Sequence, residues 1–385
     1  MTLPGANKAS TDDLRTLIVT FDPPENIGGV EGRLAGYVRE LVRTNHYVEV
    51  EAFSPSHRLS STDFHGASLH NCPSRLRSLP QTSQFTLKRF RVSQINSVFL
   101  LSGGITIFGL LLLFYCRLTR RRNAILLYGK DVLQARGRLL GRLLIRASTG
   151  LADCVFANSR YTASLVPFVR PRKVRILYPG VDPSIAAQPL APSDPYGKKI
   201  LFVGRLVERK GVKDLVDALK IVSEGIQDAS LEVVGDGPQR SQLERLVADL
   251  NLGNRVSFLG TLKGSTLYDR YASCNVFAMP SITLNDDAEG FGTVFLEAGL
   301  FGKPSVGTFS GGIPEAVEQN RTGLLVHEGQ VAELATALQK LLIDADFARS
   351  LGRNARQRVL RNFTWAEGTD LLMNSLAKAR VGKRS

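Results

Sequence analysis

The second half of the chain alternates short aliphatic runs with longer amphipathic segments, and this pattern constrains the fold most. Alternating β and α segments predict a parallel sheet with right-handed crossovers. Ligands of such sheets bind beyond the carboxyl ends of the strands, which is where the glycine-rich loops of this half fall. The predicted strands are 199–203, 230–234, 256–258, 276–278 and 304–307, and the predicted helices are 212–222, 238–250, 265–272, 331–342, 347–362 and 365–378.

The first half repeats the alternation less regularly. Its predicted strands are 17–21, 47–53, 124–128, 154–158 and 174–178, and its predicted helices are 31–44 and 133–149. Residues 54–92 are rich in Ser, Pro and Arg and predict loops with short helices. Residues 179–196 contain five prolines and little periodicity, which is typical of an interdomain linker.

One apolar segment allows two interpretations. Residues 98–116 carry no charge and are followed by Arg117 and by Arg120 to Arg122. This length and flank fit a transmembrane helix with its positive end in the cytoplasm. The alternative is a buried strand at 97–101, a turn at Gly103 and Gly104, and an apolar helix at 105–118. We favour the alternative, because it supplies a strand and a crossover that the first half otherwise lacks.

The stretch from Glu289 to Ala298 carries the clearest chemical signal. Two carboxylates, Glu289 and Glu297, flank a Gly-Phe-Gly turn and an apolar run with helical potential. Glycine lets backbone N–H groups approach an anion, and a helix beginning near Gly292 directs its positive end to the same place. Ionised carboxylates only accept hydrogen bonds, which suits the vicinal hydroxyls of sugars. Together these features predict a nucleotide-sugar pocket.

Two basic residues follow the strand predicted at 199–203. Arg205 offers a planar fork to phosphate oxygens, and Lys210 offers a mobile point charge. Both would compensate the negative charge that builds on a departing nucleoside diphosphate. The plain alternative is a pair of solvated basic residues in a loop, and the downstream pair of glutamates argues against it.

These motifs, in this order and spacing, resemble the retaining glycosyltransferases of family 4, which have the GT-B fold. The matching segments are 202–211, 233–238, 256–260, 289–298, 311–315 and 322–326. The resemblance implies an α/β protein with two Rossmann-like domains facing a cleft. It implies an acceptor-binding domain at 1–180, a linker at 181–197, a nucleotide-sugar-binding domain at 198–362, and a C-terminal helix within 363–385 that packs back on the first domain.

The resemblance also assigns roles to residues. Arg205 and Lys210 would bind the diphosphate, Glu297 would accept the ribose hydroxyls, and Glu289 would contact the transferred sugar. Gly28 and Gly29 resemble the loop of the first domain that faces the diphosphate, although a glycine pair alone marks many turns. The remaining donor-binding candidates are Gly204, Gly237, Gly290, Phe291, Gly292 and Thr293.

The chain departs from the family pattern at one position. Many relatives carry His-Gly-x-Asp near residue 128, whereas this chain has Tyr128 followed by Gly129, Lys130 and Asp131. Tyrosine can donate a hydrogen bond to a sugar hydroxyl but is a poor base near neutral pH. Asp131 either orients an acceptor hydroxyl or caps the following helix, and the sequence leaves both roles open.

The net charge of +14 is concentrated in the first half of the chain. Residues 1–196 contain 25 basic and 13 acidic residues, a net charge of +12, and the remainder contributes +2. Arg138, Arg142 and Arg146 recur on one helix face, with leucines on the other side. Such a helix either lies on anionic lipid or packs on the core with a solvated arginine face. Nucleic acid is a poorer explanation, because no aromatic stacking platform accompanies the arginines.

The remaining composition bounds the location and the cofactors. The N-terminus lacks a signal-peptide pattern, and four well-separated cysteines indicate buried free thiols, so we expect a cytoplasmic protein, peripheral at the inner face of the membrane if it meets lipid at all. We expect no cofactor besides the donor substrate. We also expect no metal, because the acidic run at 285–287 is explained by a surface turn.

Two functions follow from these patterns. The first is a retaining hexosyltransferase that uses a nucleotide-diphosphate sugar and an acceptor that is lipid-linked or a growing glycan. The second is a catalytically silent relative that binds a nucleotide sugar or an anionic membrane, which the substitution at Tyr128 motivates. The sequence does not distinguish uridine, guanosine or adenosine as the base, and it does not identify the sugar or the acceptor.

Overall fold

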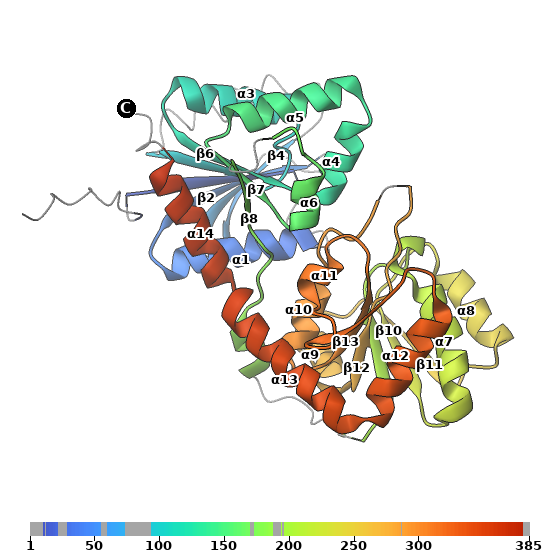
Figure 1. The fold of residues 1–385 in the computed structure, drawn as a ribbon. Coiled ribbons are helices and arrows are strands. Elements are labelled where there is room, and N and C mark those ends of the chain that lie inside the picture. Colours follow the sequence, from blue (N-terminus) through green and yellow to red (C-terminus); the bar gives the residue numbers. More distant parts are fainter. Residues whose placement is uncertain are drawn as a thin grey trace, which may run out of the picture. The chain divides into compact units, whose positions relative to one another are not determined.

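The computed structural model describes residues 11, 13–21, 29–54, 60–73, 94–169, 173–187, 194, 196–285 and 287–379. The chain divides into two compact units (Figure 1). Unit 1 comprises Met1–Gly180 together with Trp365–Ser385, and unit 2 comprises Val181–Thr364. Each unit is built on its own β-sheet, so the prediction of an α/β chain with two halves is confirmed.

Unit 1 contains an eight-stranded sheet with the order β3-β4-β2-β1-β5-β6-β7-β8. All strand pairs are parallel except β3 with β4. Its strands are β1 (Arg15–Thr20), β2 (Tyr47–Ser54), β3 (Ser60–Phe64), β4 (Ala67–Pro73), β5 (Ser97–Leu100), β6 (Arg122–Leu127), β7 (Cys154–Ala157) and β8 (Val174–Ile176). Its helices are α1 (Gly29–Arg43), α3 (Ile107–Leu118), α4 (Gly129–Arg136), α5 (Leu139–Leu151), α6 (Arg160–Ser164) and α14 (Trp365–Lys378).

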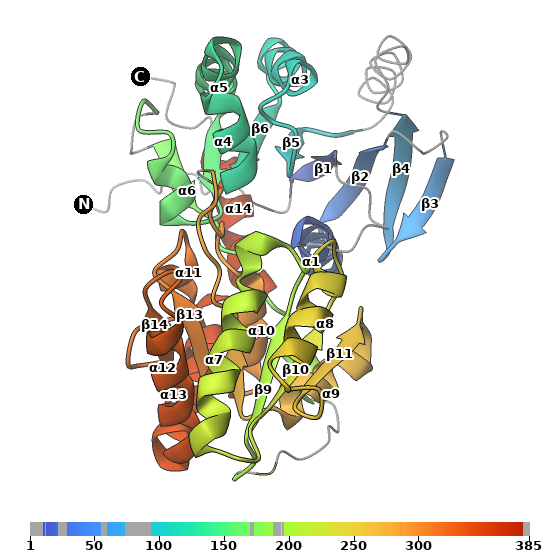
Figure 2. The ribbon, with the colours of Figure 1, turned by 90° about the vertical axis from the view of Figure 1, so that its right-hand side faces the viewer.

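The central strands of the sheet of unit 1 are buried on both faces, because successive residues point to opposite sides and helices cover each side. Ile18 of β1 packs with residues of α1 and α14, such as Leu34 and Leu376. The neighbouring Val19 packs on the opposite side with residues of α3 and α5, such as Leu113. Helix α14 therefore completes the core of unit 1, although it comes from the far end of the sequence (Figure 2).

The close approach of α14 to α1 depends on a small residue. The ring of Trp365 lies where a Cβ on Gly36 would be, at 2.2 Å from the nearest ring atom, so any side chain at this position would collide with it. Trp365 also makes an edge contact with Tyr37, with 5.3 Å between the ring centroids.

Unit 2 contains a six-stranded, entirely parallel sheet with the order β11-β10-β9-β12-β13-β14. Its strands are β9 (Lys199–Val203), β10 (Ser230–Val234), β11 (Val256–Gly260), β12 (Val276–Ala278), β13 (Ser305–Thr308) and β14 (Gly323–Val326). Its helices are α7 (Val212–Gly225), α8 (Arg240–Asp249), α9 (Gly264–Ser273), α10 (Thr293–Leu300), α11 (Ile313–Ala316), α12 (Val331–Ile343) and α13 (Ala345–Asn362), with short 3₁₀ helices η3 (Pro183–Ala187) and η4 (Glu208–Lys210).

The apolar segment at 98–116 folds as a strand, a turn and a helix, which is the interpretation favoured from the sequence. It forms β5, a turn through Gly103 and Gly104, and α3, whose N-terminus is capped by the hydroxyl of Thr106. None of the described helices is both long enough and apolar enough to cross a bilayer.

Two expectations for the first half are wrong. Residues 60–73 form the edge strand β3 and its neighbour β4 instead of loops, joined by a tight turn in which His65 and Gly66 both have positive φ. The rest of that expected loop region, 55–59 and 74–92, lies outside the described residues. The helix expected at 133–149 is two helices, because the chain is extended at Arg138 between α4 and α5. Of the four cysteines, Cys116, Cys154 and Cys274 are buried free thiols, as expected.

Candidate active site

The order of the strands places the candidate site of unit 2 at a topological switch point. From β9 the chain proceeds outward to β10 and β11 on one side, and then returns to β12, β13 and β14 on the other. Loops that leave the carboxyl ends of β9 and β12 therefore diverge, and such divergence leaves a crevice for a ligand. Lys210 follows β9 and Glu289 follows β12, so the two sequence motifs meet at this point.

The centre of the site is an ion-pair cluster around Glu289. Its Oε2 accepts hydrogen bonds from Lys210 Nζ at 2.5 Å and from Arg209 Nη1 at 3.0 Å. The side chains of Glu289 and Lys210 are only 14% and 15% exposed, so solvent screens their attraction weakly. Burial alone would raise the pKa of Glu289, but the charges of Lys210 and Arg209 and their hydrogen bonds lower it to about 2. Glu289 is therefore ionised at every physiological pH.

Arg209 is a member of this cluster that sequence reasoning missed. Besides its bond to Glu289, its Nε lies 3.5 Å from Oδ2 of Asp287. The only signal in the sequence was its position next to Lys210, and a run of adjacent basic residues is ordinary in a surface loop. Asp287 belongs to the acidic run at 285–287, whose Asp286 lies outside the described residues.

Arg205 and Lys210 differ in their surroundings. Lys210 is held by Glu289, and its ammonium group retains donor capacity for a further acceptor, since it carries three N–H bonds. The side chain of Arg205 is exposed beyond the end of β9, and it forms no hydrogen bond or ion pair with any residue that the structure describes. Arg205 is therefore an exposed cation that no described side chain neutralises.

Helix α10 begins at Thr293, directly after the turn that contains Glu289. Its N-cap residue, Gly292, has φ +85°, and no side chain caps the helix. The first N–H groups of such a helix lack intrahelical partners, and the helix dipole makes this end attractive to anions. The backbone of Gly312 braces the turn, because its N–H donates to the carbonyl of Glu289 at 2.8 Å. A Cβ on Gly312 would come within 2.3 Å of the Gly290 carbonyl oxygen.

Glu297 lies within α10 and already has one partner. Its Oε2 accepts a hydrogen bond from the hydroxyl of Tyr271 at 2.6 Å. Burial raises the pKa of Glu297, and the hydrogen bond from Tyr271 partly opposes that rise. Tyr271 is fully buried in α9 and stacks on Phe301, with 5.8 Å between the ring centroids. Sequence reasoning missed Tyr271, because nothing in the sequence links it to Glu297.

Other predicted donor-binding residues have structural roles in the sheet and its loops. Phe291 is 1% exposed and packs against Phe363, so only its backbone is in a position to meet a ligand. Gly237 packs against the backbone of Leu206, where a Cβ would come within 2.5 Å of its carbonyl oxygen. Gly204 lies beside Lys210, with 3.9 Å between a Cβ at this position and Lys210 Cε.

The candidate site residues from the first half of the chain belong to unit 1. Gly28 lies outside the described residues, and Gly29 is the first residue of α1. Asp131 is in the first turn of α4, where its Oδ1 accepts from the N–H of Val132 at 2.7 Å. Tyr128 is the N-cap residue of α4, and the guanidinium of the buried Arg33 lies over its ring at 4.9 Å from the centroid.

Comparison with known proteins assigns this chain to a family. The model of glycosyl transferases group 1 matches residues 188–358, and that of glycosyltransferase family 4 matches residues 27–185. A GDP-mannose-dependent alpha-(1-6)-phosphatidylinositol monomannoside mannosyltransferase of Mycolicibacterium smegmatis is 30% identical over 96% of this chain and 100% of its own length. The chain belongs to the family 4 glycosyltransferases.

Two further comparisons extend this assignment. A mannosyltransferase of the same description from Mycobacterium tuberculosis strain H37Rv is 39% identical, over 43% of this chain and 44% of that protein, so the match spans less than half the length of this relative. The structure of Anabaena HepE in complex with UDP is 20% identical and has a TM-score of 0.76, covering 95% of this chain and 100% of that one. This likeness supports the GT-B fold of the glycosyltransferase described here.

Proposed function

We propose that this glycosyltransferase moves a hexose from a nucleotide-diphosphate sugar to an acceptor hydroxyl with retention of the anomeric configuration. The observation that carries the proposal is the cluster of Glu289, Lys210 and Arg209 at the switch point of unit 2, beside the uncapped start of α10. It combines cations for a diphosphate with a permanently ionised carboxylate for a sugar. The family membership of the chain supports the same chemistry.

Each residue has a defined task in this proposal. Arg205 and Lys210 stabilise the negative charge on the departing diphosphate, and the first N–H groups of α10 contribute further donors. Glu297 accepts the ribose hydroxyls with the oxygen lone pairs that Tyr271 leaves available. Glu289 orients the sugar and holds Lys210 in place, so one carboxylate positions both the donor sugar and the ammonium group that binds the diphosphate. The leaving phosphate takes the acceptor proton, which removes the need for a strong base at Tyr128.

We further propose mannose as the sugar, guanosine as the base and a phosphoinositide glycolipid as the acceptor. The support is the activity of the mycobacterial relatives, which are described as GDP-mannose-dependent alpha-(1-6)-phosphatidylinositol monomannoside mannosyltransferases. A lipid acceptor also agrees with the basic first half of the chain and with a location at the inner face of the membrane.

The test is thermal stabilisation by a panel of UDP-, GDP- and ADP-sugars. A ligand that binds only the native state raises the melting temperature by mass action. We expect a clear shift with GDP-mannose that is lost in Arg205→Ala, followed by transfer of labelled mannose to phosphatidylinositol mannoside with an α-linkage by NMR. Stabilisation without transfer or donor hydrolysis would support the catalytically silent alternative. The absence of any shift with all donors would contradict both.

A further inference from the structure

Helices α3 and α5 lie side by side on one face of the sheet of unit 1 (Figure 2). Both helices leave large apolar side chains in solvent. Fifteen large hydrophobic side chains are exposed among the described residues, and seven of them belong to these two helices. We call these seven residues the α3–α5 surface. They are Ile107, Leu111, Phe114, Leu118, Leu139, Leu140 and Leu143.

The exposed apolar side chains are additional to those that the core requires. In α3 the exposed positions recur at intervals of four, three and four residues, so they share one helix face. The opposite face carries Leu112, Leu113 and Cys116, which are buried in the core of unit 1. A helix that covers a sheet needs only one apolar face, and its solvent face is usually polar. Leu118 and Leu139 are nevertheless 67% and 77% exposed.

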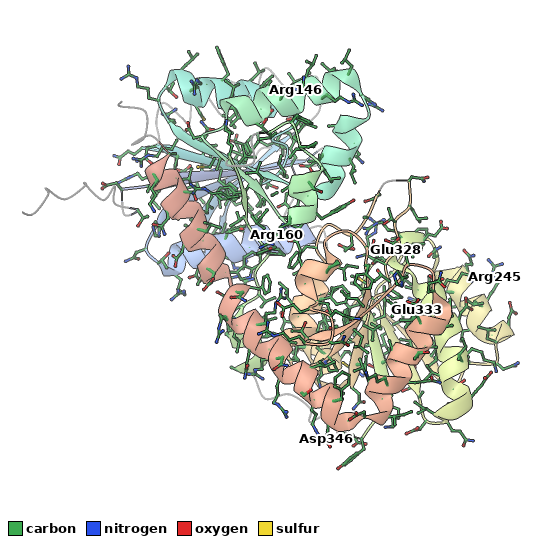
Figure 3. The ribbon with its side chains drawn as sticks, in the orientation of Figure 1. Arg146, Arg160, Arg245, Glu328, Glu333 and Asp346 are labelled. Carbon is green, nitrogen blue, oxygen red and sulfur yellow. The ribbon has the colours of Figure 1, made fainter. Side chains whose placement is uncertain are left out.

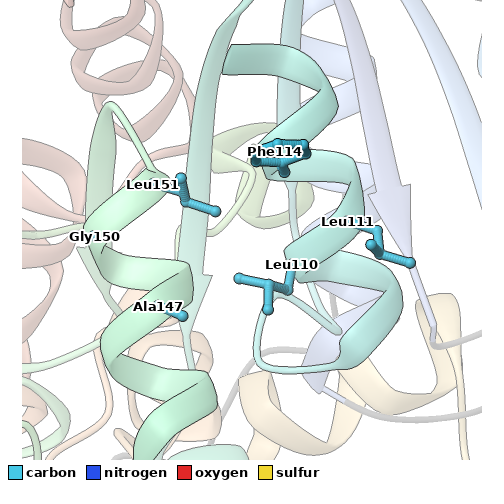
Figure 4. Close-up of a pocket in the computed structure, with 6 residues that line it drawn as sticks. All are labelled: Leu110, Leu111, Phe114, Ala147, Gly150 and Leu151. Carbon is cyan, nitrogen blue, oxygen red and sulfur yellow. The ribbon is translucent and has the colours of Figure 1, made fainter. Parts of the chain in front are cut away.

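A groove lined only by apolar residues runs between the two helices (Figure 4). Its lining comes from Leu110, Leu111 and Phe114 of α3 and from Ala147, Gly150 and Leu151 of α5. Leu111 and Phe114 belong both to the groove and to the α3–α5 surface, so the apolar lining of the groove continues onto the exposed face of α3. On α5, Leu139 and Leu143 precede Ala147 of the groove by eight and four residues, a spacing that places them along the same helix face. Contiguous apolar areas of this kind mark sites of interaction with lipid or protein.

The segment of the chain that carries the α3–α5 surface is strongly basic. Residues 97–151 contain nine Lys and Arg and a single acid, Asp131. On α5 the exposed arginines recur every four residues and form a stripe beside the leucines, with Arg146 visible in Figure 3. This stripe consists of Arg138, Arg142 and Arg146. Arg117 and Arg120 are exposed at the C-terminal end of α3.

We propose that the α3–α5 surface docks on the face of an anionic lipid bilayer. Leucine and phenylalanine would enter the boundary between head groups and acyl chains, while the arginines, with their long stems, would reach the lipid phosphates. A second copy of this chain is a poorer occupant, because a two-fold interface would bring the same arginine stripes together. This proposal names a membrane partner for the proposed glycosyltransferase. It rests on the proposed function in one respect, which is that the acceptor is a lipid.

The test is co-sedimentation with vesicles of phosphatidylcholine mixed with phosphatidylglycerol, and with vesicles of phosphatidylcholine alone. We expect the full chain to bind the anionic vesicles and to lose binding at high salt. Each arginine near an anionic surface strengthens binding about fivefold, so the triple variant Arg138→Gln, Arg142→Gln, Arg146→Gln should bind about 100-fold more weakly. The double variant Leu111→Gln, Leu143→Gln should bind about tenfold more weakly.

Matched controls lie in unit 2, where exposed residues of the same types are available. The control for charge is the triple variant Arg353→Gln, Arg356→Gln, Arg361→Gln, and the control for apolar area is Ile343→Gln with Leu360→Gln. Both controls should bind vesicles as the wild type does.

Three outcomes would overturn the proposal. They are equal binding to neutral and anionic vesicles, undiminished binding of the arginine variant, and a dimer in light scattering that the leucine variant abolishes. All variants should keep their stabilisation by the nucleotide sugar, which depends on unit 2. A variant that loses vesicle binding but is still stabilised by the donor therefore reports on the α3–α5 surface alone. If the donor does not stabilise the protein at all, the result counts against the proposed function instead.

Discussion

Lys210 Nζ and Glu289 Oε2 are 2.5 Å apart, although 79 residues separate them in the chain. The contact joins the loop after β9 to the loop after β12, which are adjacent strands of one sheet. In the proposed mechanism this pair fixes the ammonium group beside the site of the diphosphate before the donor arrives. Such preorganisation avoids reorienting charges during the reaction.

The substitution Glu289→Gln should make the free energy of unfolding less dependent on pH at acidic pH. The folded-state pKa of Glu289 is about 2, below its value of 4.5 in an unfolded chain, so its ionisation stabilises the fold above pH 4.5 and this stabilisation is lost as the pH falls towards 2. We expect the difference in free energy of unfolding between wild type and variant to shrink between pH 5 and about pH 3.5, as urea titrations would measure. A difference that is constant over this interval would contradict the ion pair.

Arg205→Ala should reduce transfer by about 10²-fold or more without changing stability. The side chain would stabilise charge on the leaving diphosphate, but it is exposed and has no partner among the described residues that its loss would disturb. Steady-state kinetics and thermal unfolding measure the two effects. Arg245→Ala on α8 (Figure 3) is the control, since it removes an exposed arginine elsewhere in unit 2 and should leave kcat/KM unchanged.

Tyr271→Phe should weaken donor binding most strongly at low pH. The hydroxyl of Tyr271 lowers the pKa of Glu297, so its removal raises that pKa further above the ordinary range. Protonated Glu297 accepts the ribose hydroxyls poorly, so donor affinity should begin to fall at a higher pH in the variant than in the wild type. Calorimetric titrations between pH 5 and about pH 8 would measure this shift. Parallel affinity curves for the two proteins would contradict the role of the hydrogen bond.

Gly292→Ala should destabilise unit 2 by about 1–3 kcal/mol, because a positive φ disfavours alanine. The added Cβ would also lie 2.7 Å from the ring of Phe295. Chemical denaturation measures the loss. Gly253→Ala is the control, because the space around this glycine is open and its φ is ordinary, and this variant should be as stable as the wild type.

Leu376→Ala should destabilise unit 1 by about 2–5 kcal/mol, since a buried leucine leaves a cavity when it is truncated. Leu376 lies on α14 and is fully buried. Trp365, the only tryptophan of the chain, begins the same helix, so its fluorescence reports the unfolding of unit 1. Leu371→Ala on the exposed side of α14 should cost much less, and equal losses for the two variants would contradict the packing of this helix.

Most of the secondary structure of unit 2 could be predicted from the sequence, although β14 and α11 were not. Strands β9, β10 and β12, and helix α14 of unit 1, begin and end at the expected residues, because buried parallel strands and amphipathic helices have strong local patterns. The edge hairpin of β3 and β4 was missed. Its strands are rich in polar residues, and its pairing depends on a neighbouring strand instead of on local periodicity.

The candidate site was predicted only in part, for a related reason. The glycine turn, Glu289, Lys210 and Glu297 are visible as a motif, but the partners Arg209 and Tyr271 are joined to it by contacts between distant segments. The sequence left open whether the helix that carries Arg138, Arg142 and Arg146 lies on lipid or packs on the core with its leucines. In the structure Leu139, Leu140 and Leu143 are exposed, and the buried face of α5 carries Gly141, Ile145, Ser148 and Thr149 instead. Roles in donor binding remain predictions for all of these residues.

The return of α14 to unit 1 has a consequence for biosynthesis. The sequence of unit 2 is continuous, so it can fold as soon as residue 364 has left the ribosome. The earlier part of unit 1 has emerged by then but lacks Leu372, Met373 and Leu376 until α14 has also been made. During that interval the nascent chain exposes the apolar face of α1 and of its sheet, which is the kind of surface that chaperones protect. The segment that precedes unit 2 in the chain therefore completes its core only after unit 2 has been made.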